Sequence, residues 1–230
     1  MALRALIFDV DGTLAETEEI HRAAFERAFA EAGLPWRWDV DRYRELLAVT
    51  GGKERIRHFI ATTPGVEDPG DARIAHLHAR KNEIYGEIVR GGGCALRPGV
   101  AELVRAASAN GLRLAIATTT SRFIVAALLA AAFADAPPDL FDPIVCGEHV
   151  AAKKPSPEAY HLALARLGLA AEDCLAFEDS RNGLAAACAA GLATIVTPSL
   201  YTAHERFDGA SAILPDLAAF DLDAHRRART

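Results

Sequence analysis

Two aspartates, Asp9 and Asp11, are the residues of this sequence best placed to do chemistry. They follow the apolar run of residues 5–8, which is typical of a buried strand, and Gly12 comes directly after them. Side chains at positions i and i+2 of an extended chain point to the same side, so both carboxylates can face one pocket. The glycine lets the backbone leave the strand at a positive φ. The segment is therefore either a functional carboxylate pair or an ordinary strand that ends in an Asp-Gly turn.

Three later segments also place reactive side chains after apolar stretches. They contain a run of hydroxyl residues, a lysine pair ahead of a proline, and two adjacent acids: Thr118, Thr119, Thr120 and Ser121; Lys153 and Lys154; Glu178 and Asp179. Each has an ordinary alternative, namely a helix N-cap, an exposed loop lysine and an acidic loop. In a parallel sheet, however, ligands bind where the carboxyl ends of the strands meet. Together the segments predict a carboxylate site suited to Mg²⁺, beside a lysine and hydroxyls that can bind a phosphoryl group.

The elements that must position these residues alternate between strand-like and helix-like patterns. The predicted strands are 3–9, 112–118, 143–146, 174–178, 193–196 and 212–214. The predicted helices between them are 100–110, a helix from an N-cap at Ser156 to Gly168, and 180–190. This alternation predicts an α/β fold with a doubly wound parallel sheet.

One long region, residues 17–93, breaks the alternation because its apolar residues recur only at helical spacing. Such a stretch is too long for one crossover within a compact sheet. We therefore expect a core domain formed by residues 1–16 and 94–230, with residues 17–93 inserted as a helical cap domain. The three glycines at 91–93 are either a hinge or a flexible surface loop.

Composition excludes several classes of function. A net charge of −6 argues against non-specific binding to nucleic acid. The sequence has no apolar run long enough for a signal peptide or a membrane span, so we expect a cytoplasmic protein. The four cysteines are widely spaced, which favours reduced thiols, and we expect Cys174 and Cys188 to be small core residues. We further expect a monomer, because the cap already covers the site, and a frayed basic tail over residues 221–230.

Four motifs together resemble those of the haloacid dehalogenase superfamily, most of whose members are phosphatases and phosphomutases. The motifs are the Asp-Val-Asp-Gly-Thr run of residues 9–13, Thr118 after a strand, Lys154 before Pro155, and Glu178-Asp179. The resemblance spans essentially the whole chain and includes a helical cap inserted after the first motif.

This resemblance implies a role for each motif residue. Asp9 is expected to be the nucleophile and Asp11 the general acid and base. Thr118 is expected to hold the transferring phosphoryl group, while Lys154 balances the charge beside Asp9. The implied ligands of Mg²⁺ are Asp9, the Asp11 backbone carbonyl, Asp179 and, as a further ligand or a support, Glu178. For these roles Asp9 must stay ionised, whereas Asp11 must carry a proton to donate.

A closer resemblance is to the branch that contains β-phosphoglucomutase and the CbbY-type sugar-bisphosphate phosphatases associated with the Calvin cycle. It implies a small phosphorylated sugar as substrate, with xylulose 1,5-bisphosphate as the leading candidate. The implied substrate-binding residues are Glu18, His21, Gly51, Gly52, Lys53, Glu54, Arg55, His78, Lys81, Thr119 and Thr120. The glycines and basic residues among them could bind a second phosphate. His21 either hydrogen-bonds a sugar hydroxyl or packs at the hinge.

Two other functions remain open from sequence. A sugar phosphomutase would use the same core residues and differ only in whether water or a sugar hydroxyl accepts the phosphoryl group. A non-catalytic sugar-phosphate-binding regulator would keep the fold as a sensor, although Asp9 and Asp11 argue against it because a sensor needs no nucleophile beside an acid.

Overall fold

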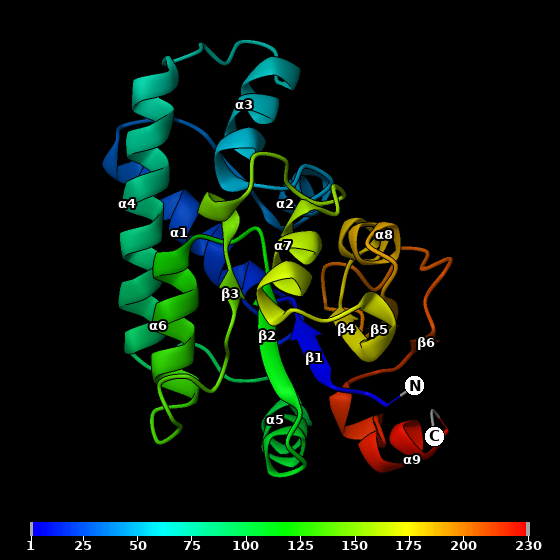
Figure 1. The fold of residues 1–230 in the computed structure, drawn as a ribbon. Coiled ribbons are helices and arrows are strands. Elements are labelled where there is room, and N and C mark those ends of the chain that lie inside the picture. Colours follow the sequence, from blue (N-terminus) through cyan, green and yellow to red (C-terminus); the bar gives the residue numbers. More distant parts are fainter. Residues whose placement is uncertain (1, 229–230) are drawn as a thin grey trace.

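A single six-stranded sheet runs through the part of the chain that the structure, a computed structural model, describes, which is residues 2–228. All neighbouring strands are parallel, in the order β3-β2-β1-β4-β5-β6 (Figure 1). The strands are β1 (Ala5–Phe8), β2 (Arg113–Ala117), β3 (Ile144–Val145), β4 (Cys174–Glu178), β5 (Ala193–Val196) and β6 (Ala212–Ile213). The six predicted strands and the parallel α/β fold are confirmed, with most of the strands shorter than expected.

Helices cover both faces of this sheet. One face carries α5 (Val100–Ala109) and α6 (Arg122–Ala132), and the other carries α7 (Glu158–Leu167) and α8 (Arg181–Ala189). Side chains alternate along β1, so Leu6 and Phe8 pack on the first face while Ala5 and Ile7 pack on the second. Burial on both faces explains why the strands read as continuous apolar runs.

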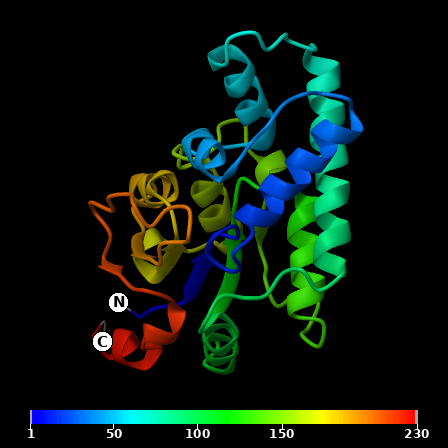
Figure 2. The same ribbon diagram turned by 180° about the vertical axis from the view of Figure 1, so that it is seen from behind.

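The four helices between residues 17 and 93 gather over one end of the sheet, and we call them the cap (Figure 2). They are α1 (Glu18–Glu31), α2 (Val40–Leu46), α3 (Gly52–Thr62) and α4 (Asp71–Arg90). Aromatic and aliphatic side chains such as Phe25, Trp38 and Phe59 form a hydrophobic cluster of their own among these helices. The chain enters and leaves the cap at adjacent points, since Ala15 and Leu96 form an isolated antiparallel bridge. The exact domain boundaries at 16/17 and 93/94 stay a prediction.

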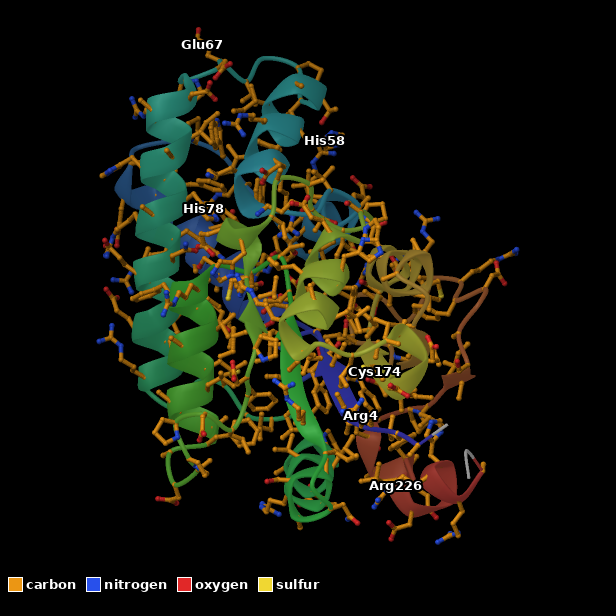
Figure 3. The ribbon with its side chains drawn as sticks, viewed as in Figure 1. Arg4, His58, Glu67, His78, Cys174 and Arg226 are labelled. Atoms are coloured by element: carbon orange, nitrogen blue, oxygen red, sulfur yellow. The ribbon has the colours of Figure 1, made fainter. Side chains whose placement is uncertain are left out.

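The sheet order places its crevice beside β1 and β4, which are neighbours although they lie far apart in sequence. The chain crosses over in opposite directions from this point, and ligands of doubly wound sheets bind there, beyond the carboxyl ends of the strands. The cap faces the same edge. In Figure 3, His78 belongs to α4 of the cap. Arg4, just before β1, and Cys174, the first residue of β4, lie together at the other end of the strands, away from the cap.

Three local predictions differ from the structure. Helix α7 begins at Glu158 rather than directly after Ser156, and Pro157 is its N-cap residue. Cys188 is exposed, so its predicted place in the core is wrong; it lies on the outer face of α8, while Ala187 faces the sheet. The predicted frayed tail is also wrong over the described residues, because Asp221 caps the helix α9 (Leu222–Arg227). The last two positions of that prediction, 229 and 230, lie outside the described residues.

Within residues 2–228, three short 3-10 helices complete the elements: η1 (Gly147–His149), η2 (Ala171–Asp173) and η3 (Leu217–Ala219). None of the helices described is both long enough and apolar enough to cross a membrane.

Candidate active site

Three carboxylates meet where β1 and β4 end. Asp9 follows β1, Glu178 is the last residue of β4, and Asp179 follows it; one oxygen of each lies within 4.8 Å of the others. All three side chains are buried. Gly12 makes the close approach of the two loops possible, because its φ is +78° and a Cβ there would lie 2.2 Å from Asp179 Oδ2. The strand positions therefore bring together acids that are separated by about 170 residues of sequence.

Lys154 neutralises part of this charge. Its Nζ lies 2.6 Å from Asp9 Oδ1 and 2.6 Å from Glu178 Oε1, and the side chain is almost fully buried. Tyr160 of α7 donates a second hydrogen bond to Glu178 Oε1, at 2.5 Å. Burial alone would lower the pKa of Lys154, but Asp9 and Glu178 outweigh this effect and raise it, so the ammonium group stays charged.

The adjacent Lys153 makes a different contact. Its ammonium group donates to the backbone carbonyl of Gly147, and the residue is only half-buried. The loop that carries both lysines is held by Glu158, whose carboxylate accepts hydrogen bonds from the backbone N–H groups of Ala151 and Ala152. The structure thus places Lys154, and not Lys153, beside the carboxylates.

Asp11 contacts both the core and the cap. Its carboxylate accepts hydrogen bonds from Thr120, after β2, and from Thr17, where α1 begins, at 2.6 Å. His21 Nε2 lies 3.0 Å from Asp11 Oδ1, and Lys81 Nζ lies 2.6 Å from the other ring nitrogen of His21. His21 therefore connects Asp11 to a buried lysine of α4, and a hydrogen bond from His21 to a sugar hydroxyl stays a prediction.

Without a bound cation, the pKa values of the two aspartates are shifted in opposite directions. Burial raises the pKa of Asp9 to about 8; Lys154 opposes this effect, while Glu178 and Asp11 add to it. For Asp11, burial also favours the protonated form, but His21 and the hydrogen bonds from Thr120 and Thr17 together hold its pKa well below the usual range. The cap brings an imidazole to Asp11, whereas Asp9 lies among acids. The roles that the resemblance implies for the two aspartates require a cation and a substrate beside these carboxylates, and they stay predictions.

The hydroxyl run after β2 is not a side-chain cap of α6. Ser121 is the N-cap residue, but its side chain makes no capping hydrogen bond, and the Glu148 carboxylate accepts from the Arg122 backbone N–H instead. Thr118 is buried, and its Oγ1 accepts a hydrogen bond from the backbone N–H of Thr120. The Thr118 hydroxyl hydrogen can then be donated to an oxyanion, as the sequence suggested.

The cap contributes a second set of polar groups around the N-terminus of α3. Gly51 has a φ of +99°, and a Cβ at Gly52 would lie 2.6 Å from the His78 ring. Burial, with Lys81 and Lys53 nearby, lowers the pKa of His78 to about 3, so its ring is neutral. Lys53 is exposed in the first turn of α3, where backbone N–H groups also favour an anion.

Arg55 and Glu18 are joined by a residue that the sequence did not single out. The Tyr43 hydroxyl donates to Glu18 Oε2 at 2.8 Å and accepts from Arg55 Nη1 at 3.0 Å. Arg55 also donates to the Val49 carbonyl. Both predicted side chains are therefore held in place by the cap rather than free to move.

All but one of the predicted site residues line a single cavity of about 390 Å³ between the core and the cap. The exception is Glu178, whose carboxylate lies behind Lys154 and Tyr160. The cavity wall also contains residues that the sequence analysis missed, including Arg44, Asn182 and Tyr201. Such a volume falls within the range of small-molecule sites.

The carboxylates fit a divalent cation. Glu178 Oε2 is buried and has no hydrogen-bond partner among the described residues, and Asp9 and Asp179 supply further oxygens. Burial raises the pKa of both aspartates, and in Asp179 the charges of Asp9 and Glu178 add to this effect. A hard cation that prefers oxygen ligands would offset the repulsion among these acids.

The fold and this site define the class of protein. A family model described as haloacid dehalogenase-like hydrolase matches residues 3–191, so the chain belongs to that family and is an enzyme of the hydrolase class.

Particular relatives resemble the chain over nearly its full length. Protein CbbY of Rhodobacter capsulatus is 54% identical over 220 residues, which cover 95% of this chain and 96% of the relative. The crystal structure of CbbY from Rhodobacter sphaeroides in complex with phosphate superimposes with a TM-score of 0.90 at 50% identity, covering 94% of this chain and 96% of that one. A mutant of the same protein, in complex with Xylulose-(1,5)bisphosphate, matches with a TM-score of 0.90 at 49% identity and the same coverage.

Proposed function

We propose that this enzyme is a Mg²⁺-dependent phosphatase that removes one phosphate from a sugar bisphosphate, with xylulose 1,5-bisphosphate as the leading candidate. The observation that carries the proposal is a single cavity with positively charged side chains at both its core end and its cap end, where two phosphates could be bound. Asp9, Thr118 and Lys154 lie at the core end, and Lys53 lies at the cap end beside the N-terminus of α3. The complex of the related CbbY with xylulose bisphosphate supports this choice of substrate.

The first step is attack of an Asp9 carboxylate oxygen on phosphorus, which forms an aspartyl phosphate and releases the sugar oxygen. Two unit negative charges at roughly 4 Å repel each other by about 4 kcal/mol at an effective dielectric constant near 20. Lys154 reduces this repulsion and the Thr118 hydroxyl orients the phosphoryl oxygens. Mg²⁺, held by Asp9, Asp179 and the Asp11 backbone carbonyl, would supply further positive charge and favour the ionised form of Asp9.

The proton for the leaving sugar oxygen comes from Asp11. A hydrogen bond joins Asp11 to His21, so this pair can hold a proton close to the reacting oxygen. A phosphate dianion beside Asp11 raises the pKa of its carboxyl group and favours the proton on Asp11. In the second step, Asp11 accepts a proton from the water that attacks phosphorus, and Asp9 is restored.

A screen of phosphate release tests this function. Purified enzyme is offered sugar monophosphates and bisphosphates with Mg²⁺, with the Asp9→Asn variant as blank. We expect the enzyme to release one equivalent of inorganic phosphate per molecule of a five-carbon sugar bisphosphate. Isomerised sugar phosphate with little phosphate release, and a requirement for a bisphosphate primer, would instead identify a phosphomutase.

The affinity for Mg²⁺ should rise with pH. Burial raises the pKa of Asp9 to about 8, above that of an exposed aspartate. In the metal-free protein, the contribution of this carboxyl group to the free energy of unfolding is therefore fully present below about pH 4 and is lost as the pH rises through 8. The cation must displace this proton, so its affinity should increase by at least about tenfold per pH unit below 8, and more steeply where Asp179, whose pKa burial also raises, gives up a proton as well. Titration calorimetry at pH 6, 7 and 8 measures the slope. The Asp9→Asn variant should give a shallower slope, and a pH-independent affinity of the wild type would contradict the assignment.

Lys53→Ala should reduce kcat/KM for the sugar bisphosphate by about 10- to 100-fold, because a charged hydrogen bond to the second phosphate is lost. Hydrolysis of a small monophosphate, which does not reach the cap end, should change little. Arg57→Ala is the matched control, since Arg57 lies on the same helix, pairs with Asp71 and does not line the cavity. Equal losses on both substrates in Lys53→Ala would exclude a phosphate site in the cap.

The setting of the enzyme is part of the same proposal. We place it in the cytoplasm as a monomer, where a reducing environment suits its widely spaced cysteines. The resemblance of the cap motifs to the CbbY-type branch favours carbohydrate metabolism linked to the Calvin cycle.

A further inference from the structure

We infer that Tyr201 is a positioning residue that couples closure of the cap to the placement of Asp179. Tyr201 belongs to the loop of residues 199–205, which follows β5, and no step of the proposed reaction uses it. The inference rests on the proposed function, because it takes Asp179 as a ligand of the divalent cation.

Tyr201 belongs to the part of the chain that forms the sheet, but its ring lies in the hydrophobic cluster of the cap. Its side chain is 3% exposed, and its ring meets that of Tyr43 edge-to-face at 5.7 Å between centroids. The Arg44 guanidinium lies 5.9 Å from the same ring. The Tyr201 hydroxyl donates a hydrogen bond of 2.5 Å to Glu19 Oε2, in the first turn of α1. Opening of the cap would therefore expose this ring and break its hydrogen bond.

The next residue in the loop, Thr202, holds Asp179. Its hydroxyl lies 2.8 Å from the Asp179 backbone carbonyl and 3.2 Å from Asp179 Oδ2. Ser199 keeps this hydroxyl in place, because its backbone N–H donates to Thr202 Oγ1 at 2.8 Å. On the opposite side, Asp179 Oδ2 packs directly against Gly12, since a Cβ at that position would lie 2.2 Å from this oxygen. The carboxylate is thus positioned between the 199–205 loop and the loop after β1.

A second core–cap contact comes from the same part of the core. Asn182, in the first turn of α8, donates to the Ala48 carbonyl and to Thr50 Oγ1 in the cap, both at 3.2 Å. Asp179 therefore lies between two core segments that touch the cap. If closure fixes the 199–205 loop, it also fixes Asp179; by reciprocity, a cation bound at Asp179 favours the closed cap.

The test uses three variants of the full-length enzyme. Tyr201→Ala removes the ring, Tyr201→Phe removes only the hydroxyl, and Leu200→Ala is the matched control, since Leu200 is the adjacent residue and is 72% exposed. Binding of Mn²⁺ without substrate is measured by the electron paramagnetic resonance signal of the free ion. Small-angle X-ray scattering gives the radius of gyration of the same samples.

We expect Tyr201→Ala to bind Mn²⁺ about fivefold more weakly or worse and to show a larger radius of gyration. Tyr201→Phe, which keeps the ring and loses only the hydrogen bond to Glu19, should show a smaller but measurable loss of affinity, and Leu200→Ala should match the wild type. Circular dichroism shows whether Tyr201→Ala folds. If it does not, the inference requires a measurable loss of Mn²⁺ affinity in Tyr201→Phe and none in Leu200→Ala. Wild-type affinity in the Tyr201 variants would overturn the inference alone. Absence of Mn²⁺ binding in the wild type would overturn both it and the proposed function.

Discussion

Asp9→Asn is expected to slow phosphate release from the sugar bisphosphate on the order of 10⁴-fold or more, because the attacking oxygen is lost. The substitution keeps the shape of the side chain and removes a carboxyl group whose pKa burial raises to about 8. Lys154 retains Glu178 as its partner. The variant should therefore fold with a thermal stability no lower than that of the wild type, and steady-state assays with Mg²⁺ measure the loss of rate.

Binding of the substrate to this variant is the control. The cap end of the cavity is unchanged, so the sugar bisphosphate should still bind and raise the melting temperature. A variant that binds the substrate and also hydrolyses it at more than a few per cent of the wild-type rate would exclude Asp9 as the nucleophile.

Lys154→Met should affect both activity and stability. Loss of the ammonium group leaves the buried carboxylates of Asp9 and Glu178 without their shared cation, which should cost about 3 kcal/mol in the free energy of unfolding. The phosphoryl group would also meet an uncompensated Asp9, and we expect kcat to fall on the order of 10³-fold. Denaturant unfolding and phosphate-release kinetics measure the two effects.

Lys153→Met is the matched control, one residue away in the same loop. Lys153 is half-buried and contacts the Gly147 carbonyl rather than a carboxylate. Its replacement should cost much less in stability and in kcat. Comparable losses in the two variants would show that the ion pair with Asp9 is not the source of the effect.

The sequence predicted which side chains of the core come together, because strand ends are local features. An apolar run followed by a polar residue indicates where a buried strand stops, and in a parallel sheet all such ends lie at one edge. Asp9, Thr118 and Asp179 could be placed in this way, and Lys154 could be placed by its proline and the helix that follows it.

Contacts between distant parts of the chain could not be predicted in the same way. Tyr160 supports Glu178, and Tyr43 joins Arg55 to Glu18, through hydroxyl groups whose direction depends on how helices pack. The pKa values of Asp9 and Asp11 depend on such contacts too, since the pKa of Asp11 is lowered by a histidine that only the folded cap brings near.

The same limit applies to the errors at α8 and α9. An apolar stretch does not show which helix face meets the sheet, so Cys188 was placed in the core although it is exposed. A charged tail likewise does not show that Asp221 will cap a short helix, or that Arg226 will reach Asn110, the C-cap residue of α5.

Chemical trapping of the phosphorylated enzyme tests the central claim most directly. The enzyme is mixed with the sugar bisphosphate and Mg²⁺, quenched in acid within the first turnover, and reduced with borohydride, which converts an aspartyl phosphate into homoserine. Mass spectrometry of the peptides should find homoserine at position 9 only, and only in samples quenched during turnover. An unmodified Asp9 in samples that have released phosphate, together with inversion of configuration at a chiral phosphate, would contradict the account.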